Sequence, residues 1–401
     1  MNKVLIPEFR FPDFVKEGEW EKKTLNSVSE VIMGSSPSSS SYNENKTGLP
    51  LLQGNADIKN RLSVPRIYTS EVTKECEVDD ILLSVRAPVG TVAKSLHKAC
   101  IGRGISALRA TKPNSQEYLY QWFFSYESSW QNISQGGTFD AVNSDDIRNL
   151  LLPIPKPQEQ KKIAFCLSSL DEVIAGYSQK LELLKDHKKG LMQNLFPQEG
   201  ESLPKYRFPE FVNTGKWLES TLGDKEVSYF VTEKVSVNML NLDSYVSTEN
   251  MLSDFSGVSK AWKLPQLGSF TKFKNGDILI SNIRPYLKKV WKADKIGGAS
   301  NDVLVFRSGL KVISEFLECI IKNEAFINYV MESAKGVKMP RGDKSSMQKY
   351  IVFIPSKDEQ QKIASCLSAC DELITAQMAK IEQLKLHKKG LMQGLFPKIN
   401  D

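Results

Sequence analysis

The sequence predicts an α+β protein made of an internal repeat, in which two mixed α/β domains alternate with two long helices in pseudo-twofold fashion. Two pairs of matching segments support this prediction. A stretch with helical periodicity, residues 151–197, returns as residues 351–397, and a shorter stretch, residues 7–20, returns as residues 204–217. The intervening segments have similar lengths but dissimilar residues, which is typical of two domains that share an architecture and differ in their surfaces.

The repeat sets the predicted domain boundaries. A period of about 200 residues is too long for a solenoid, so each copy is interpreted as a domain-sized unit. The shorter matching stretch, called here the RFP arm after its residues 10–12 and 207–209, opens each domain. We predict a first α/β domain over residues 1–153, a first long helix over 154–197, a second α/β domain over 198–353 and a second long helix over 354–401.

Composition excludes several classes of protein. With 401 residues, of which 41% are apolar and 25% charged, the chain fits a globular protein with room for two cores. The six cysteines include no CxxC pair, so neither a zinc site nor a disulfide framework is indicated, and no metal is expected. No signal peptide or membrane-length apolar run is present, which predicts a cytoplasmic location without a membrane partner. The net charge of +6 is compatible with a polyanionic partner but is weak support for one.

Each α/β domain is predicted to contain short strands and a helix. The run Asp80–Ser84 matches Asp277–Ser281 and has the composition of a buried strand, and Arg86 and Arg284 lie at similar places beyond it. A helix with aromatic residues along one face is predicted over residues 117–134. Residues 315–334 take its place in the second copy.

The long helices carry apolar residues in alternating steps of four and three, which is the spacing of a coiled-coil seam. Lys188 and Lys388 interrupt the series near the end of each helix. Each helix finds one mate with the same seam in the chain, so we predict that the two pair; the alternative is that each docks on its own neighbouring domain. The predicted seam consists of Ile163, Leu167, Leu170, Ile174, Leu181 and Leu184 in the first helix and of Ile363, Leu367, Ile374, Ile381 and Leu384 in the second.

The ends of the long helices are also marked. Pro157 suits the first helical position, and Ser356 with Glu359 predicts a capping box at the start of the second helix. Gly190 and Gly390 follow a basic segment and are predicted as possible C-caps. These limits give helices of roughly 30 to 38 residues, or about 45 to 57 Å at the usual rise per residue.

The ordered motifs resemble those of the specificity (S) subunit of Type I restriction-modification enzymes, the HsdS family. The resemblance rests on the RFP arm, a domain that ends in a PIP-type segment, the helical motif EQxxIAxxLSxxDExI and the closing HKKGLMQxLFP. All four occur in the same order in both copies and together cover nearly the whole chain. The helical motifs are long and specific, whereas the motifs inside the α/β domains are weak.

The resemblance implies a function and partners. The α/β domains would be target recognition domains, each reading one half of a bipartite, asymmetric site on double-stranded DNA. The long helices would form an antiparallel coiled coil that separates these domains and docks two modification (methyltransferase) subunits. Restriction (motor-nuclease) subunits would join through that complex, so that the partners methylate adenine or cleave the DNA.

The sequence contains no recognisable catalytic motif. No GxxxxGK[ST] P-loop, no glycine-rich S-adenosylmethionine motif and no NPPY or DPPY tetrapeptide occurs. We therefore expect no catalytic residue and no cofactor bound by this chain, and we expect S-adenosylmethionine, ATP and magnesium in the partner subunits. His187 and His387 are matched copies in the basic helix ends, which favours capping or a surface contact over catalysis. Spacing does not decide whether scattered carboxylates and lysines form a nuclease site, so that alternative stays open.

The candidate DNA contacts are residues whose side chains can bind phosphates or base edges. Each residue alone is more often an ordinary surface charge, but their positions near turns at corresponding places favour them as a group. The polar loop over residues 34–46 either orders on phosphates or is simply solvated. The candidates are Gln53, Asn55, Arg86, Arg103, Thr138 and Asn143 in the first domain and Asn282, Arg284, Tyr286, Lys288, Lys289, Lys338, Arg341 and Lys344 in the second.

Two other functions stay open at this point. One is an orphan specificity or adaptor protein that binds the modification subunit without directing restriction. The other is a self-contained methyltransferase, which the missing cofactor motifs oppose.

Overall fold

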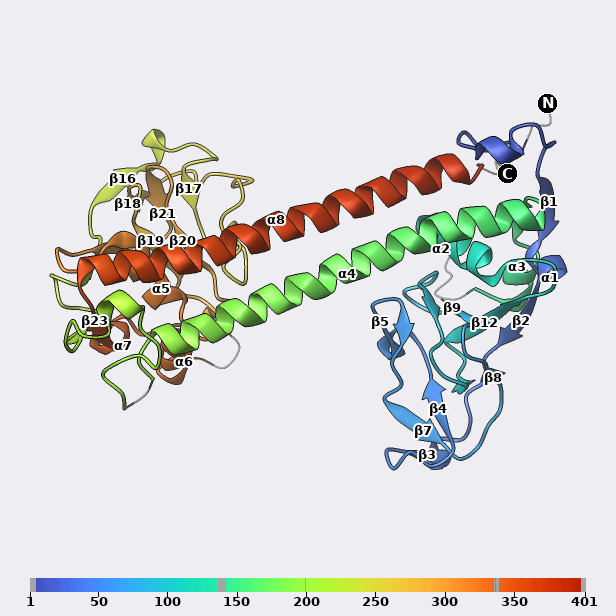
Figure 1. Ribbon diagram of the computed structural model, residues 1–401, viewed down its shortest axis with the longest axis horizontal. Coiled ribbons are helices and arrows are strands. Elements are labelled where there is room, and N and C mark those ends of the chain that lie inside the picture. The colour runs from blue at the N-terminus through green and yellow to red at the C-terminus, as the bar shows by residue number, and fades with distance from the viewer. Residues whose placement is uncertain (1–4, 136–141, 199, 335, 337–338, 398–401) are drawn as a thin grey trace. The chain divides into compact units, whose positions relative to one another are not determined.

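The computed structural model describes residues 5–135, 142–198, 200–334, 336 and 339–397. It divides into two compact units, one made of Met1–Gln179 with Met378–Asp401 and the other of Lys180–Gln377. Each unit contains one α/β domain, the first half of one long helix and the second half of the other. The long helices are α4 (Pro157–Leu195) and α8 (Lys357–Leu395), of 39 residues each, drawn in green and red in Figure 1. None of the described helices is both long and apolar enough to span a membrane.

The described part of the first α/β domain contains three sheets and three short helices. A two-stranded sheet pairs β1 (Glu21–Thr24) with β13 (Leu151–Ile154). The six-stranded sheet has the order β2 (Ser29–Met33), β12 (Ile105–Ala110), β9 (Ile81–Ser84), β10 (Val92–Lys94), β6 (Leu62–Ser63) and β5 (Ile58–Lys59). The five-stranded sheet has the order β3 (Tyr42–Asn43), β7 (Ile67–Thr69), β4 (Leu49–Leu52), β11 (Ala99–Ile101) and β8 (Glu75–Cys76). The helices are α1 (Leu25–Val28), α2 (Gln116–Gln135) and α3 (Ser144–Arg148), with 3-10 turns η1 (Pro12–Phe14), η2 (Ser39–Ser41) and η3 (Asn55–Asp57).

The described part of the second α/β domain repeats this plan with fewer strands. A two-stranded sheet pairs β14 (Leu218–Thr221) with β23 (Ile351–Ile354). One four-stranded sheet has the order β15 (Ser228–Phe230), β22 (Val303–Ser308), β19 (Ile278–Ser281) and β20 (Val290–Lys292). The other has the order β16 (Lys234–Ser236), β18 (Ser269–Phe273), β21 (Gly297–Ala299) and β17 (Tyr245–Val246). The helices are α5 (Ser314–Lys322), α6 (Glu324–Glu332) and α7 (Lys344–Lys349), with 3-10 turns η4 (Pro209–Phe211), η5 (Val237–Met239) and η6 (Pro285–Leu287).

The two domains share their central strand pairing. Strand β12 pairs antiparallel with β9, and β22 pairs antiparallel with β19. The strand directly before β12 or β22 pairs in parallel with a strand nearer the start of its domain. These pairs are β11 with β4 and β21 with β17. The predicted α+β class, with two mixed domains and two long helices in an internal repeat, is therefore confirmed.

A buried carboxylate anchors each central strand pair. Asp80, directly before β9, accepts hydrogen bonds from Arg109 at 2.8 and 2.6 Å, and Asp277, directly before β19, accepts them from Arg307 at 2.7 and 2.8 Å. The aspartate side chains are only 3% and 1% exposed. These hydrogen bonds raise the pKa of both guanidinium groups above the usual value. Arg109 and Arg307 are therefore fixed parts of the fold.

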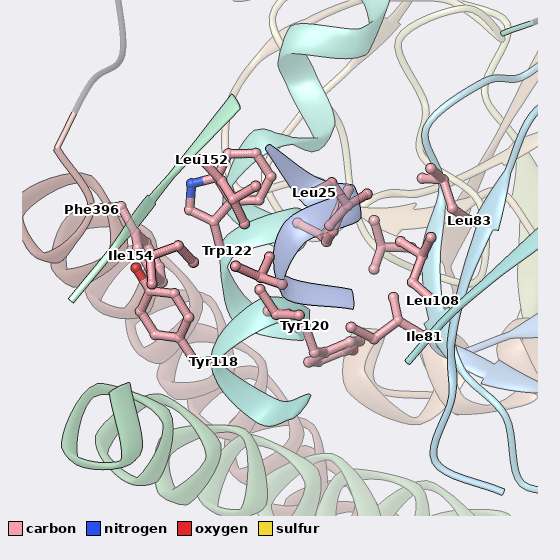
Figure 2. Packing of buried hydrophobic residues seen from close by; sticks show 14 of the residues in the cluster. Leu25, Ile81, Leu83, Leu108, Tyr118, Tyr120, Trp122, Leu152, Ile154 and Phe396 are labelled. Carbon is pink, nitrogen blue, oxygen red and sulfur yellow. The ribbon is translucent and has the colours of Figure 1, made fainter. Parts of the chain in front are cut away.

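Helix α2 forms where the aromatic helix was predicted and carries its rings at four-residue steps. Trp122 stacks on Tyr126 with ring centroids 5.0 Å apart, and Tyr126 meets Trp130 edge-on at 5.6 Å. The hydrophobic core of the first unit gathers around this helix. Figure 2 shows Leu83 and Leu108 of the six-stranded sheet on one side of it.

The other side of α2 packs on the ends of the long helices. Tyr118 is fully buried there, and its hydroxyl donates a hydrogen bond to the carbonyl of Pro153 at 2.6 Å. Its ring lies edge-on to Phe396, just beyond α8, with centroids 5.6 Å apart. Figure 2 shows Tyr118, Ile154 and Phe396 together. The end of the second long helix is thus built into the core of the first unit.

The second domain departs from the prediction of one helix over residues 315–334. The helix is broken into α5 and α6 at Asn323, whose backbone is extended at φ −69° and ψ 136°. The Asn323 side chain accepts a hydrogen bond from the amide of Ala325 at 2.9 Å. Asparagine caps a new helix in this way more readily than it continues an old one.

The RFP arm is held by a buried ion pair at the start of each long helix. Arg10 binds both carboxylate oxygens of Glu159 at 2.8 and 2.9 Å, and Arg207 binds those of Glu359 at 2.8 and 2.7 Å. The side chains are 7% and 1% exposed in the first pair and 9% and 1% in the second. Hydrogen bonding to glutamate raises the pKa of both arginines. Each arm is thereby fastened to the helix that follows its own domain.

The same arms also bind the end of the other long helix. The amide of Phe9 donates to the carbonyl of Gly394 in α8 at 2.8 Å, and the amide of Tyr206 donates to the carbonyl of Asn194 in α4 at 2.9 Å. A side chain on Gly394 would collide with the ring of Phe9, because a Cβ there would lie 2.2 Å from it. Each arm therefore joins the two long helices within its own unit.

A buried glutamine next to each paired glutamate binds the α/β domain. Gln160 accepts a hydrogen bond from the amide of Ser115 at 2.8 Å, directly before α2, and donates to the carbonyl of Pro155 at 2.9 Å. Gln360 accepts from the amide of Ile313 at 2.9 Å, directly before α5, and donates to the carbonyl of Pro355 at 3.0 Å. The adjacent glutamate and glutamine thus connect helix, arm and domain, and this group is called here the Glu-Gln clamp (Glu159–Gln160 and Glu359–Gln360).

The lysine that interrupts each apolar series forms an ion pair with the other long helix. Lys188 of α4 binds Asp371 of α8 at 2.6 and 2.7 Å, and Lys388 of α8 binds Asp171 of α4 at the same distances. Burial lowers the pKa of the Lys388 ammonium, and the hydrogen bond that it donates to Asp171 opposes that effect. Because high numbers on one helix meet low numbers on the other, the helices run antiparallel within each unit.

The predicted seam positions are the less exposed positions of both long helices. Ile163 and Leu167 belong to the core of the first unit, together with Met392 and Leu395 of α8. In the central turns, Ile381 is 6% exposed, and the remaining seam residues are half-buried. The end of each seam therefore packs on the α/β domain as well as on the other helix. Helix pairing and docking on the neighbouring domain, which were alternatives in the sequence, occur together.

Two predictions about the helix ends were wrong. Gly190 and Gly390 do not cap the helices, which continue to Leu195 and Leu395. A glycine inside a helix costs about 1 kcal/mol relative to alanine, and the last turn recovers more than this by burying Leu195 or Leu395 in a core. At Glu359 only half of the capping box forms, because its amide donates to Ser356 while its carboxylate binds Arg207.

Removing one partner of the buried Arg207–Glu359 pair should destabilise the protein strongly, whereas replacing both partners by apolar residues should not. Glu359→Leu alone should cost about 3–5 kcal/mol, because it leaves a buried guanidinium unpaired. Adding Arg207→Met should restore most of the loss, which thermal and denaturant unfolding of the full chain would measure.

The exposed pair Lys362–Glu210, with side chains 52% and 46% exposed, is the matched control. Replacing Lys362 by alanine should cost less than about 1 kcal/mol. Equal losses in both pairs would contradict the role given to the clamp.

Candidate nucleic-acid interface

A polar pocket of about 330 Å³ opens where three turns of the first α/β domain meet. One turn follows β4, one follows β9, and one joins β11 to β12. Four of the lining residues are predicted DNA contacts, so the structure brings together residues that lie far apart in the sequence. The lining consists of Ser36, Gln53, Gly54, Asn55, Ser84, Arg86, Ala87, Arg103 and Gly104.

Hydrogen bonds fix the two turns that carry the arginines. The hydroxyl of Ser84 donates to the carbonyls of Arg86 and Pro88 at 2.9 and 2.8 Å, which holds the turn after β9. The amide of Arg103 donates to the hydroxyl of Ser36 at 3.2 Å, which holds the turn before β12. The backbone of both turns is therefore fixed. The side chains of Arg86 and Arg103 are exposed.

The third turn is held equally firmly. The amide of Gln53 donates to the carboxylate of Asp57 at 2.8 Å, and Asp57 is 1% exposed. The side-chain nitrogen of Gln53 donates to the hydroxyl of Tyr42 at 2.8 Å. A Cβ at Gly104 would lie 2.2 Å from the carbonyl oxygen of Gln53, so only glycine allows these two turns to approach.

The arginines of the chain fall into two classes. Seven bind carboxylates (Arg10, Arg61, Arg66, Arg109, Arg207, Arg307 and Arg341), and Arg148 donates to a backbone carbonyl. Within the part of the chain that the structure describes, the guanidinium groups of Arg86, Arg103 and Arg284 have neither an ion pair nor a hydrogen bond. All three are predicted DNA contacts, and all three are exposed.

The other candidates of the first domain have structural roles or cannot be placed. Asn55 donates to the carbonyl of Pro88 at 3.3 Å and to the hydroxyl of Thr91 at 3.1 Å, so its amide joins two turns. Asn143 is the N-cap of α3 and forms a capping box with Asp146. Thr138 lies outside the described residues. DNA contact by these residues stays a prediction.

A second pocket of about 330 Å³ lies in the second domain at the counterparts of two of the three turns that line the first pocket, and the turn after β19 does not line it. It lies beyond β17 and beside the turn from β21 to β22, as the first pocket lies beyond β4 and beside the turn from β11 to β12. Its lining differs in kind, because it contains carboxylates and a tryptophan in place of unpaired arginines. The lining consists of Tyr245, Ser247, Thr248, Glu249, Asn250, Ala261, Trp262, Lys263, Pro265, Ser300 and Asp302.

Three candidates of the second domain contact this second lining. The ammonium of Lys289 donates to the carbonyl of Thr248 at 2.7 Å. The guanidinium of Arg341 lies 3.2 Å from the carboxylate of Asp302. The backbone amide of Asn282 donates to the backbone carbonyl of Asp302 at 2.7 Å. These candidates gather at the second pocket, but the charged groups of Lys289 and Arg341 already have protein partners.

Three of the remaining candidates, Arg284, Tyr286 and Lys288, lie at the 3-10 turn η6. Arg284 and Lys288 flank this turn with left-handed backbones, each at φ 52°. The ammonium of Lys288 binds Glu324 at 2.6 Å, whereas Tyr286 is exposed. Lys344 is exposed at the start of α7, and Lys338 lies outside the described residues. A strained backbone is most often kept where a site requires it, which favours Arg284 as a functional residue.

Trp262 was not among the residues predicted from the sequence. This residue is 70% exposed, its indole N–H donates to Glu249 at 3.2 Å, and the ammonium of Lys263 lies 4.0 Å from its ring centroid. The available signal was a tryptophan beside a lysine in a polar segment. It went unused because the segment has no counterpart in the first copy.

Within the residues described, no group of three or more histidine, cysteine, aspartate or glutamate side chains is placed to hold a metal ion. The two pockets offer hydrogen-bond donors, acceptors and, in the second, the rings of Tyr245 and Trp262. Such groups are suited to recognising a polar surface by complementarity.

Comparison with known proteins identifies the family. The chain matches the family described as Type I restriction modification DNA specificity domain over residues 17–186 and again over residues 230–386. The two matched segments cover most of the chain and correspond to the two copies of the repeat.

Similar proteins carry related descriptions. The putative type I restriction enzyme MjaX specificity subunit of Methanocaldococcus jannaschii is 35% identical over 44% of this chain and 42% of that protein, which is less than half of its length. The type I restriction enzyme MjaIX specificity subunit of the same organism is 24% identical over 97% of this chain and 95% of that protein. The type I restriction enzyme EcoDI specificity subunit of Escherichia coli is 23% identical over 62% and 61%.

Solved structures share the fold. The crystal structure of the Type-I restriction-modification system S subunit from M. genitalium has a TM-score of 0.61 at 16% identity, covering 98% of this chain and 100% of that chain. A chain from a structural study of complex assembly and conformational transition of the type I R-M system has a TM-score of 0.57 at 15% identity, covering 94% and 97%. With the family match over both repeats, the resemblance seen in the sequence is confirmed, and the chain belongs to the Type I restriction modification DNA specificity domain family.

Proposed function

We propose that this chain is the specificity subunit of a Type I restriction-modification system and reads a bipartite, asymmetric site on double-stranded DNA. The observation that supports this proposal most is the pair of polar pockets at corresponding turns of the two α/β domains. The scaffold around them repeats, whereas their linings differ. Two different readers on a repeated scaffold suit a site with two different halves.

DNA contact would involve the groups that the fold leaves free. Arg86 and Arg103 at the first pocket, and Arg284 near the second, are exposed cations without described protein partners. Free cations can neutralise phosphates or donate to base edges without first breaking an ion pair. Tyr286 and Trp262 add exposed aromatic surface in the second domain.

In this proposal, the chemistry belongs to partner proteins. Two modification subunits would bind S-adenosylmethionine and methylate adenine, and restriction subunits would use ATP and magnesium to translocate and cleave DNA. This chain would bind none of these cofactors and would act by positioning its partners. The proposal is supported by the family match and by the absence of nucleotide and methyl-donor motifs from the sequence.

The outer surfaces of the long helices offer a docking site for the modification subunits. Val173 of α4 and Leu373 of α8 occupy equivalent positions and are 44% and 57% exposed. Phe165, also on α4, is 71% exposed. Exposed apolar side chains that recur on equivalent faces favour a protein interface over chance.

The test of the proposed function is co-expression of the full chain with the modification subunit of the same system, in cells that lack other adenine methylation. Sequencing should show methylated adenines within one motif that has two unlike halves and an unread spacer. No methylation without the chain, and none without its partner, would exclude a self-contained methyltransferase. Methylation without restriction after the motor-nuclease is added would favour the orphan specificity protein.

The contrast between Arg284 and Lys288 predicts different effects on salt dependence. Arg284→Ala should reduce the slope of log affinity against log salt concentration by about 0.9, because one phosphate contact is lost. Replacing Lys288 and Glu324 together by alanine removes a neutral ion pair and should leave the slope unchanged. Binding of a duplex carrying the methylated motif, measured over a range of salt concentrations, checks this. Equal slopes for wild type and Arg284→Ala would remove Arg284 from the phosphate contacts.

The docking surface can be tested without disturbing either core. Val173→Asp with Leu373→Asp should weaken binding of the modification subunit by about tenfold or more per site, since buried interface residues commonly contribute 1–2 kcal/mol. The control replaces the neighbouring exposed residues Glu172 and Glu372 by glutamine. Affinity would be measured by calorimetry on purified proteins. A loss of the same size in both variants would argue against an apolar interface at these positions.

A further inference from the structure

The first pocket is fitted to one kind of base pair. We propose that Arg86, Arg103 and Gln53 read a G·C pair through the major groove in the half-site bound by the first unit. This inference rests on the proposed function and specifies it at one position. It follows from the donors and acceptors that the pocket leaves unused.

The pocket presents two guanidinium groups, each with several N–H donors, that no described side chain satisfies. Arg86 and Arg103 enter the lining from separate turns, and the lining contains no carboxylate. Elsewhere in the chain, seven arginines are paired with carboxylates, as described above. An exposed arginine alone indicates little, but two that line one concave site from fixed turns have a common direction of approach. Holding the backbone in advance also reduces the entropy lost when the side chains bind.

The pocket also presents acceptors. Oδ1 of Asn55 is buried and has no partner among the described residues, and the identity of a second acceptor, on Gln53, is fixed by its neighbours. The Tyr42 hydroxyl donates to the carbonyl of Pro37 at 3.3 Å, so it accepts the hydrogen bond that it shares with the Gln53 amide at 2.8 Å. The side-chain group of Gln53 that faces Tyr42 is therefore its nitrogen. Its oxygen Oε1 has no partner among the described residues and remains a free acceptor at the pocket.

Guanidinium groups together with free side-chain acceptors distinguish a base-pair edge from a phosphate. A phosphate offers only acceptors at neutral pH, so Gln53 Oε1 would find no donor on it. In the major groove, guanine presents the acceptors O6 and N7, and its paired cytosine presents an N4 amino donor. One arginine can bind both guanine acceptors, or the two arginines can bind one acceptor each, and a side-chain oxygen accepts from the cytosine amino group. In an A·T pair the adenine N6 donor lies between the acceptors N7 and O4, so the two acceptors are not adjacent. The free groups of this pocket match that pattern.

The second pocket, in the second unit, does not offer the same set. Its lining contains the carboxylates of Glu249 and Asp302, and its nearest guanidinium, that of Arg341, is already paired with Asp302. The G·C assignment is therefore specific to the first unit. One half of the methylated motif should depend on the first pocket, and the other half should not.

The experiment uses the full chain in complex with its modification subunit. Affinities are measured for duplexes that carry the motif methylated by the wild-type complex and for all its single-base-pair variants. Wild type should require G·C at one position of one half-site, with other pairs bound about 5- to 150-fold more weakly. Arg103→Ala and Arg86→Ala should remove part of this discrimination, and Arg103→Lys, which lacks the planar fork, should restore it only incompletely.

Gln53→Met tests the acceptor separately. It should weaken discrimination at the same base pair and leave the salt dependence unchanged, because no charge is lost. Arg284→Ala, in the other unit, is the matched control and should leave this position fully discriminated. Thermal unfolding of each variant checks that the fold is kept, as expected for exposed side chains.

The possible outcomes separate the inference from the proposed function. Lost discrimination at one G·C position supports the inference. If Arg86→Ala and Arg103→Ala weaken every sequence equally and lower the salt slope, the arginines bind phosphates and the inference is overturned. Unchanged discrimination in both variants overturns it as well. If the wild-type complex neither methylates nor binds any sequence selectively, the proposed function itself fails.

Discussion

A buried glutamate must have a cationic partner, and this requirement organises both halves of the protein. Glu159 and Glu359 are each 1% exposed, so each would be strongly destabilising without the arginine of its RFP arm. The side-chain amide of the adjacent glutamine is buried too, and it binds the segment that leads into α2 in the first domain or into α5 in the second. Two neighbouring residues thus fix arm, domain and long helix to one another. This explains why the arm and the helical motif recur together in the sequence.

The protein separates residues that maintain the fold from residues that are free to recognise a ligand. Charged groups of the scaffold are neutralised internally, as in the Glu-Gln clamp, the Asp80–Arg109 pair and the Lys388–Asp171 pair. The unpaired arginines instead lie on turns beyond the central strands. Substitutions at such exposed positions usually change stability by no more than about 0.5 kcal/mol. New recognition surfaces can therefore arise on the same scaffold without loss of the fold.

Much of this arrangement could be predicted from the sequence, because it depends on local patterns that occur twice. The duplicated helices, the aromatic helix α2 and the strands beginning after Asp80 and Asp277 all follow from periodicity and composition. Arg86 and Arg103 lie near turns, as predicted, while DNA contact by them stays a prediction. Their convergence with Gln53 could not be predicted, since it depends on the parallel pairing of β4 with β11, two strands about 50 residues apart in the chain.

The errors have equally specific causes. Gly190 and Gly390 look like helix ends when only backbone propensity is considered, but the leucines that follow gain more from burial than the glycines cost. Arg341 and Lys289 are bound by groups from distant segments, which local patterns do not reveal, and DNA contact by them stays a prediction. Trp262 was missed because comparison of the two copies gives no information about a segment present in only one of them.

The central claim is that the repeated scaffold carries two recognition domains that act independently. The most direct measurement exchanges residues 21–150 for the equivalent segment of a relative and keeps both RFP arms, both clamps and both long helices. Methylated adenines would then be mapped by sequencing in cells that contain the hybrid and its modification subunit. The account predicts a motif in which one half is new and the other half is unchanged. A motif altered in both halves, from a hybrid that folds and methylates, would contradict it.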